Sequence, residues 1–216
     1  MRNASAPSPA ARRVLATRNA FWARALARRL AASGVRPNTV SIISVAFAAG
    51  AAAAFAVAPF RGYAAWLIAA AACIQLRLLC NMLDGMLAIE GGLKSRTGDI
   101  YNEFPDRLAD IVILAGAGYA LRDVPSGPAL GWLAAVLALL TAYIRVLSGS
   151  LGLPQRFLGP MAKQHRMFVL TLAALIDALF SSSPRALWAG LVVIVVGSAV
   201  TAGRRTLHLL RDAEAR

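Results

Sequence analysis

Hydrophobic residues along the chain gather in six long runs, separated by short breaks that contain glycine, proline or charged residues. Each run has about 17 to 25 residues, the length that an α-helix needs to cross a hydrocarbon core of roughly 30 Å. The runs are Asn38–Ala58, Ala64–Ile89, Ile100–Leu121, Ala129–Leu151, His165–Phe180 and Arg185–Gly203. The pattern predicts an all-α integral membrane protein with six transmembrane helices. The fifth is short and contains Asp177, which either pairs with an arginine or marks a contact between helices.

The segment before the first run has a different pattern. Between Thr17 and Ala32, apolar residues recur at helical spacing with arginines between them, which is typical of an amphipathic helix on a membrane surface. Pro37 is a helix-start signal, and Asn38 or Thr39 is expected to cap the first turn. No continuous apolar core precedes a cleavage site, so we do not expect a cleavable signal peptide. The chain is divided into a basic N-terminal segment (1–36), a six-span domain (37–203) and a basic tail (204–216).

Composition supports the membrane assignment and indicates which partner the positive charge meets. The chain is 58% hydrophobic and 15% charged, whereas soluble domains are about 25% charged. The net charge of +13 lies at helix ends and in loops, which points to anionic membrane lipids and not to nucleic acid. Basic residues are most numerous before the first run and after the second, fourth and sixth. The positive-inside rule therefore places both termini in the cytoplasm, and the alanine- and arginine-rich composition favours a bacterial plasma membrane.

Acidic residues are concentrated in one short stretch. Six of the ten acids fall between Asp84 and Asp110, where the second run ends and the third begins. Unpaired charges at the edge of a span are costly, and clustered like charges repel one another. We therefore expect a cation among them, and a divalent metal ion is the simplest choice. The alternative is a set of surface acids paired with Lys94, Arg96 and Arg107.

Helical geometry arranges these acids in two stripes that face each other. At about 100° per residue, the end of the second helix presents one polar face, made of Asn81, Asp84, Gly85 and Ala88. The start of the third presents another, made of Asp99, Asn102, Glu103, Asp106 and Asp110. The small side chains of Gly85 and Ala88 leave room for a planar or phosphate group. Two opposed polar stripes with space between them indicate a site and not a packing seam.

The two stripes resemble the motif of the integral-membrane CDP-alcohol phosphatidyltransferases. That family carries D-x-x-D-G-x-x-A-R, then eight residues, then G-x-x-x-D-x-x-x-D. The same spacing occurs here, with identity at five positions, namely Asp84, Gly85, Ala88, Gly98 and Asp106. The six-span layout and the Pro-Asn-Thr that opens the first span also look like that family. The specific part of the resemblance covers about 26 residues.

The resemblance implies a reaction and a set of residue roles. In the family, one or two Mg²⁺ or Mn²⁺ ions hold the diphosphate of a CDP-linked lipid such as CDP-diacylglycerol, an alcohol takes over the phosphatidyl or related phospho-group, and CMP leaves. The implied metal ligands are Asn81, Asp84, Asn102 and Asp106, with Asp99, Glu103 and Asp110 as further candidates. Asp106 is also the implied base. The implied donor-binding residues are Gly85, Ala88, Ser95, Gly98 and Asn38. The family resemblance also suggests a homodimer.

Three departures from the family motif leave catalysis open. Asn81 and Asn102 stand where the family has aspartate, and an amide oxygen can bind a hard metal but brings no negative charge. Ile89 stands where the family has arginine, and Arg96 or Arg107 is a candidate to replace it. The departures fit either an active branch with a different substrate or a non-catalytic member that binds CDP-lipid or metal.

Three cations further along the chain form a candidate acceptor site. Arg145, Lys163 and Arg166 could bind a phosphate on the acceptor alcohol, and they are equally explained as topology signals. We rank a phospholipid-forming transferase first and a non-catalytic relative second. A small cation transporter ranks third, because its acids would be spread through the membrane depth, whereas these gather at one face.

Overall fold

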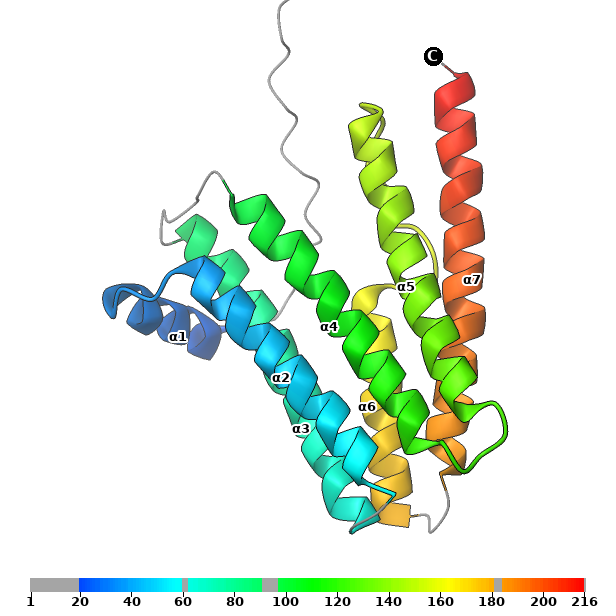
Figure 1. The fold of residues 1–216 in the computed structure, drawn as a ribbon. Coiled ribbons are helices and arrows are strands. Elements are labelled where there is room, and N and C mark those ends of the chain that lie inside the picture. Colours follow the sequence, from blue (N-terminus) through cyan, green and yellow to red (C-terminus); the bar gives the residue numbers. More distant parts are fainter. Residues whose placement is uncertain (1–19, 60–61, 91–96, 181–183, 216) are drawn as a thin grey trace, which may run out of the picture.

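The computed structural model describes residues 20–59, 62–90, 97–180 and 184–215. These residues form seven helices and no strands, as Figure 1 shows. The helices are α1 (Phe21–Ala32), α2 (Pro37–Val57), α3 (Tyr63–Glu90), α4 (Gly98–Ala120), α5 (Gly127–Ser150), α6 (Lys163–Phe180) and α7 (Arg185–Glu214). The predicted all-helical class is confirmed, and each predicted span corresponds to one of the helices α2 to α7.

Four of these helices, α2, α3, α5 and α7, are long and apolar enough to cross a membrane. Within the described residues, α4 and α6 do not meet that criterion. The first turns of α4 carry four of the ten acids of the chain, and α6 has only 18 residues, with Lys163, Arg166 and Asp177 among them. The prediction of six membrane spans is therefore supported for four helices and stays a prediction for the other two.

The start of α2 differs in detail from the prediction. Pro37 occupies the first helical turn, where its missing N–H would have had no intrahelical partner in any case. The N-cap position is Arg36, and no side chain caps the helix. The expectation that Asn38 or Thr39 would cap this turn is therefore wrong, because both residues already lie inside the helix.

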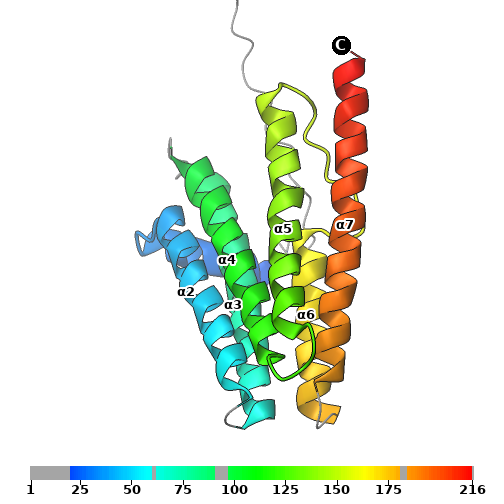
Figure 2. The same ribbon diagram turned by 45° about the vertical axis from the view of Figure 1, so that its right-hand side comes forward.

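The helices α2 to α7 pack as a closed ring of neighbours. α2 packs against both α3 and α4, α4 packs against α5, α5 and α6 both pack against α7, and α3 packs against α6. Direct contact between α3 and α4 is slight. Figures 1 and 2 show α4 and α5 close together near the loop that joins them and diverging toward their other ends. The site described below lies on α3 and α4, toward the end where α4 and α5 diverge.

The close crossing of α4 and α5 depends on two glycines. A Cβ atom on Gly118 would lie 2.8 Å from the Cα atom of Gly131, and one on Gly131 would lie 2.7 Å from the Cα atom of Gly118. Cβ atoms do not approach backbone atoms this closely, so any side chain at either position separates the helices. Small residues of this kind are typical of helix crossings inside membranes.

We expect Gly118→Ala to destabilise the fold by about 1 to 3 kcal/mol, because overpacking a tight contact displaces the backbone. Gly203→Ala in α7 is the matched control, since nothing lies within 4 Å of a Cβ atom there. Thermal unfolding of both variants in detergent checks the prediction. Equal melting temperatures for the two variants would contradict it.

Asp177 has the second of the two roles predicted for it, a contact between helices. Its carboxylate accepts hydrogen bonds from the backbone N–H groups of Ala186 (3.0 Å) and Leu187 (2.8 Å), in the first turn of α7. The side chain is fully buried in α6. These amides have no partner within their own helix, so Asp177 caps α7 and ties α6 to the first turn of α7.

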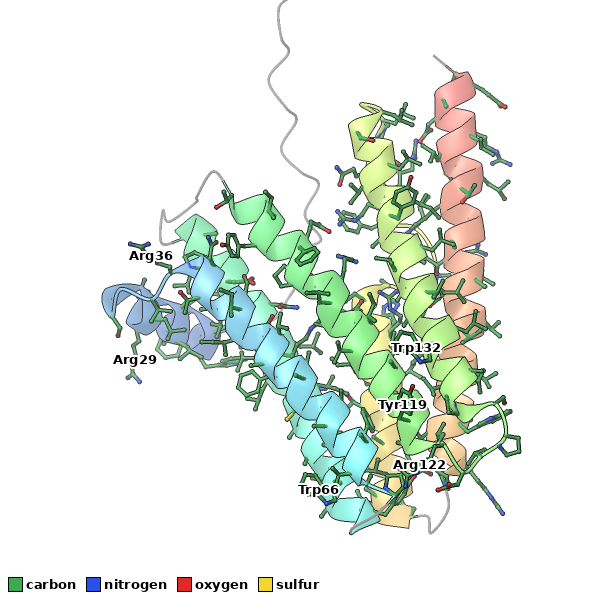
Figure 3. The ribbon with its side chains drawn as sticks, in the orientation of Figure 1. Arg29, Arg36, Trp66, Tyr119, Arg122 and Trp132 are labelled. Carbon is green, nitrogen blue, oxygen red and sulfur yellow. The ribbon has the colours of Figure 1, made fainter. Side chains whose placement is uncertain are left out.

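α1 lies at the flank of the bundle, on the left in Figure 1, and packs against α3. Its inner face is built on Ala23 and Ala27, which are buried, while Phe21 and Trp22 are exposed. Figure 3 shows Arg29 and Arg36 at this side of the molecule and Trp66 near the opposite end. Residues 17–19 of the predicted helix lie outside the described residues. The position of α1 on the membrane surface stays a prediction.

Candidate active site

The polar stripes of α3 and α4 are brought together by α2. Because α2 packs against both helices, the ends that carry Asp84 and Asp106 are held at a distance that side chains can bridge. Asn81, one helical turn before Asp84 on α3, donates a hydrogen bond of 2.7 Å to Asp106 of α4. The predicted facing of the two stripes is therefore found, and polar and charged side chains connect them.

Asp84 is buried, with only 5% of its surface exposed. The hydroxyl of Ser41, on α2, donates a hydrogen bond of 2.7 Å to Oδ2 of Asp84. The other oxygen, Oδ1, is buried and accepts no hydrogen bond. Ser41 therefore fixes the orientation of this carboxylate and leaves one oxygen without a partner.

Both carboxylate oxygens of Asp106 have partners. The amide nitrogen of Asn81 donates to Oδ1 at 2.7 Å, and a guanidinium nitrogen of Arg77 lies 3.4 Å from the same oxygen. The ammonium group of Lys163, at the start of α6, forms an ion pair with Oδ2. Asp106 is thus held by two side chains of α3 and one of α6.

Asp110 lies one helical turn further along α4 and is the centre of a buried ion triad. Arg77 binds one of its oxygens at 2.9 Å, and Arg166 binds the other at 2.9 Å. None of the three side chains is more than 3% exposed. Arg166 also donates to the backbone carbonyl of Met161 at 3.1 Å. The triad joins α3, α4 and α6 below the Asp84–Asp106 pair.

Glu103 lies at the outer edge of the site. It pairs with Arg107 one turn away on α4, at 3.1 Å, and with Arg145 of α5. Arg145 also donates to Gln155 at 3.1 Å and lies over the ring of Phe157, 5.5 Å from its centre. Cation–π and ion-pair contacts together hold Arg145 in place, so it bridges α4 and α5 where the two helices diverge.

We expected an external metal ion to hold the acidic cluster together, and this expectation is wrong. Cations of the chain itself hold it together. They are Arg77, Arg107, Arg145, Lys163 and Arg166. Asp110 and Glu103, which were predicted as further metal ligands, form ion pairs with arginines instead. The alternative of surface acids is also wrong for Asp84 and Asp110, which are buried.

The predicted site residues are only partly brought together. Lys163 reaches the Asp84–Asp106 pair, whereas Arg166 lies deeper with Asp110, and Arg145 lies outside with Glu103. Gly85, Ala88, Gly98 and Asn38 are half-buried on the helices where they were predicted. Ser95, Lys94 and Arg96 and the side chains of Ile89, Asp99 and Asn102 lie outside the described residues.

Two functional-site residues were not found from the sequence. Arg77 is fully buried and binds both Asp106 and Asp110, and Ser41 orients Asp84. A signal for Arg77 does exist, because it lies four residues before Asn81 and seven before Asp84, on the same helical face. An arginine inside an otherwise apolar run is itself a sign of function. Ser41 has no comparable signal.

The donor set of the described residues fits a divalent ion only in part. No group of three or more His, Cys, Asp or Glu side chains among them could hold a metal ion. The unpartnered Oδ1 of Asp84, in contrast, is a buried anionic oxygen that lacks a donor or cation. Mg²⁺ commonly binds through one or two carboxylates together with substrate phosphates and water. The residues therefore fit an ion that Asp84 and a phosphorylated ligand hold jointly.

Comparison with known proteins finds similarity to solved structures. No family model matches the chain, and no curated protein matches it significantly. Among solved structures it is similar to phosphatidylinositol phosphate synthase (PgsA1) of Mycobacterium tuberculosis. The structure of that enzyme with manganese and citrate has 26% sequence identity and a TM-score of 0.74, over 87% of this chain and 88% of that chain.

Two further structures of the same enzyme agree. The one with CDP-DAG bound has 24% identity and a TM-score of 0.75, over 88% of this chain and 94% of that chain. The apo form has 26% identity and a TM-score of 0.72, over 86% of this chain and 94% of that chain. The structural match confirms the resemblance seen in the motif: the chain has the fold of a CDP-alcohol phosphatidyltransferase.

Proposed function

We propose that the protein is a membrane phosphotransferase that moves a phosphatidyl or related phospho-group from a CDP-linked lipid to an alcohol, with release of CMP. One observation carries the proposal. Asp84 and Asp106 occupy the motif positions on neighbouring helix ends, in a fold shared over most of the chain with an enzyme solved with manganese and with CDP-DAG. The function would be a step of phospholipid biosynthesis.

The reaction replaces a phosphoanhydride bond of the donor with a phosphoester bond to the alcohol. The oxygen of the alcohol forms a bond to the phosphorus that carries the lipid, the bond from that phosphorus to the CMP phosphate breaks, and CMP leaves. The proton of the alcohol goes to a base, for which Asp106 is the candidate because its carboxylate is 13% exposed, whereas Asp84 and Asp110 are buried. In this proposal Oδ2, now paired with Lys163, receives the proton.

A divalent ion would supply charge neutralisation on the diphosphate oxygens when bound. Asp84 would hold it through Oδ1, and the amide oxygens of Asn81 and Asn102 are further candidate ligands. Ser41 keeps Oδ1 free by binding Oδ2. Gly85 and Ala88, with small side chains on the same face of α3, are the candidate positions where a nucleotide would approach the helix.

Lys163 is the best candidate to meet the acceptor. Its side chain is 23% exposed and lies on Asp106, so an acceptor that delivers its proton to Asp106 would contact Lys163 as well. An acceptor with its own phosphate would gain most from this cation. Arg145 is nearby on α5 but is shared with Glu103 and Gln155, and Arg166 is committed to Asp110.

A non-catalytic relative that binds CDP-lipid is the second candidate. It is favoured by one observation, namely that Asn81 donates its amide hydrogen to Asp106, whereas the family has a carboxylate at that position. A catalytic role is favoured by the two aspartates that remain. A cation transporter is disfavoured, because Glu103, Asp106 and Asp110 are already paired with cations of the chain.

The test is CMP release from CDP-diacylglycerol by the purified full chain with Mg²⁺ or Mn²⁺ and a panel of alcohols that includes glycerol phosphate, inositol phosphate and serine. Asp84→Asn should reduce the rate by roughly 100-fold or more, because even groups that only orient a metal ligand contribute about 10- to 100-fold. Asp123→Asn, in an exposed loop residue between α4 and α5, is the matched control. No metal-dependent CMP release with any alcohol would favour the binding protein.

A further inference from the structure

Both carboxylate oxygens of Asp106 already have partners within the chain. Oδ1 accepts from Asn81 and lies near Arg77, while Oδ2 is paired with Lys163. A divalent ion on this carboxylate would lie beside the ammonium group of Lys163 or the guanidinium group of Arg77, and the like charges would repel each other. The ion pairs of Asp106, in partly buried surroundings, are strong, so Asp106 is a poor metal ligand in this arrangement.

Asn81 reinforces this arrangement. Its side chain carries no charge, and it presents its amide N–H group to Asp106 at 2.7 Å. An aspartate at this position would instead place a second carboxylate beside Asp106, and the pair would then require a cation of higher charge. With an amide at position 81, the single positive charge of Lys163 on the neighbouring oxygen is enough to balance Asp106.

Two of the three carboxylates of the inner site are paired with cations of the chain. Asp106 is paired with Arg77 and Lys163, and Asp110 with Arg77 and Arg166, whereas Asp84 accepts its hydrogen bond from the neutral hydroxyl of Ser41. Of these three carboxylates, Asp84 is the one with a buried oxygen that has no partner in the described part of the chain. Among the described residues, the place left for a cation is therefore on Asp84.

We propose that Lys163 acts as a built-in cation on Asp106, so that each chain binds a single divalent ion, through Asp84. The inference rests on the proposed function, because it concerns the metal of the same site. It adds that the two motif aspartates have different tasks. Asp84 binds the ion, whereas Asp106 is kept off the metal by Lys163 and Asn81.

The experiment titrates Mn²⁺ into the purified full chain in detergent and counts free Mn²⁺ by electron paramagnetic resonance. Wild-type protein should bind one saturable ion per chain, and Asp84→Asn should lose it. Asn81→Asp combined with Lys163→Gln returns a carboxylate to α3 and removes the competing ammonium group. This double variant should bind two ions per chain.

The single variant Lys163→Gln tests the cation directly. Loss of one positive charge beside the site should tighten Mn²⁺ binding by on the order of tenfold. Arg107→Gln is the matched control, since it removes the same charge from a group that is 4.0 Å from Asp106 and is paired mainly with Glu103. An equal gain in both variants would overturn the specific role of Lys163.

The outcomes separate this inference from the proposed function. Two ions per wild-type chain, or no saturable ion at all, would overturn the inference whether or not CMP is released. A double variant that still binds one ion would overturn it too. One ion per chain with no CMP release from any alcohol would support the inference and contradict the proposed transferase.

Discussion

Asp106→Asn is expected to reduce CMP release by about 10²- to 10⁴-fold, the usual contribution of a general base. The substitution keeps the size and shape of the side chain and removes its ability to accept a proton. It also leaves the ammonium group of Lys163 without its anion. The measurement is the initial rate of CMP release at saturating donor and metal, together with the melting temperature of the variant.

Two further variants make this result specific. Asp106→Glu retains a carboxylate and should retain more activity than Asp106→Asn. Asp123→Asn removes an exposed acid in the loop between α4 and α5 and should leave the rate unchanged. A rate for Asp106→Asn within about tenfold of wild type, in folded protein, would mean that another group takes the proton and that Asp106 is a structural partner of Lys163.

Much of the fold follows from local sequence patterns. Each apolar run became a helix whose start lies within two residues of the prediction, because turn signals such as Pro37 and Gly127 interrupt the pattern sharply. The end of α7 was missed. The apolar run stops at Gly203, but the helix continues to Glu214, since leucine, arginine and alanine sustain backbone hydrogen bonding outside an apolar environment.

The site was predictable only where its members are close in sequence. Helical spacing predicted the polar faces of α3 and α4 that carry Asp84 and Asp106, because each face is set within a single helix. Two of their partners come from other helices: Ser41 from α2 and Lys163 from α6. Which cation meets which acid depends on how α3 packs against α6, and a sequence pattern in one helix carries no record of that packing.

Asp110 provides the strongest test of how the bundle is held together. Asp110→Leu is expected to destabilise the fold by about 3 to 5 kcal/mol, the usual cost of leaving a buried charge without its partner. Two guanidiniums, those of Arg77 and Arg166, would then remain buried with no carboxylate between them. Equilibrium unfolding in detergent measures the effect. Asp212→Asn, which breaks an exposed pair with Arg156, should cost less than about 1 kcal/mol.

The triple variant Arg77→Met, Asp110→Leu, Arg166→Met decides what the triad contributes. Replacing all members of a buried ion network by apolar residues is often neutral or stabilising, so this variant should regain most of the stability lost in Asp110→Leu. It should nevertheless lose CMP release, because Arg77 also binds Asp106. A triple variant as unstable as Asp110→Leu would show that the triad is needed for folding itself. Recovered stability with impaired activity would instead mean that the triad serves to position Asp106 beside Asp84.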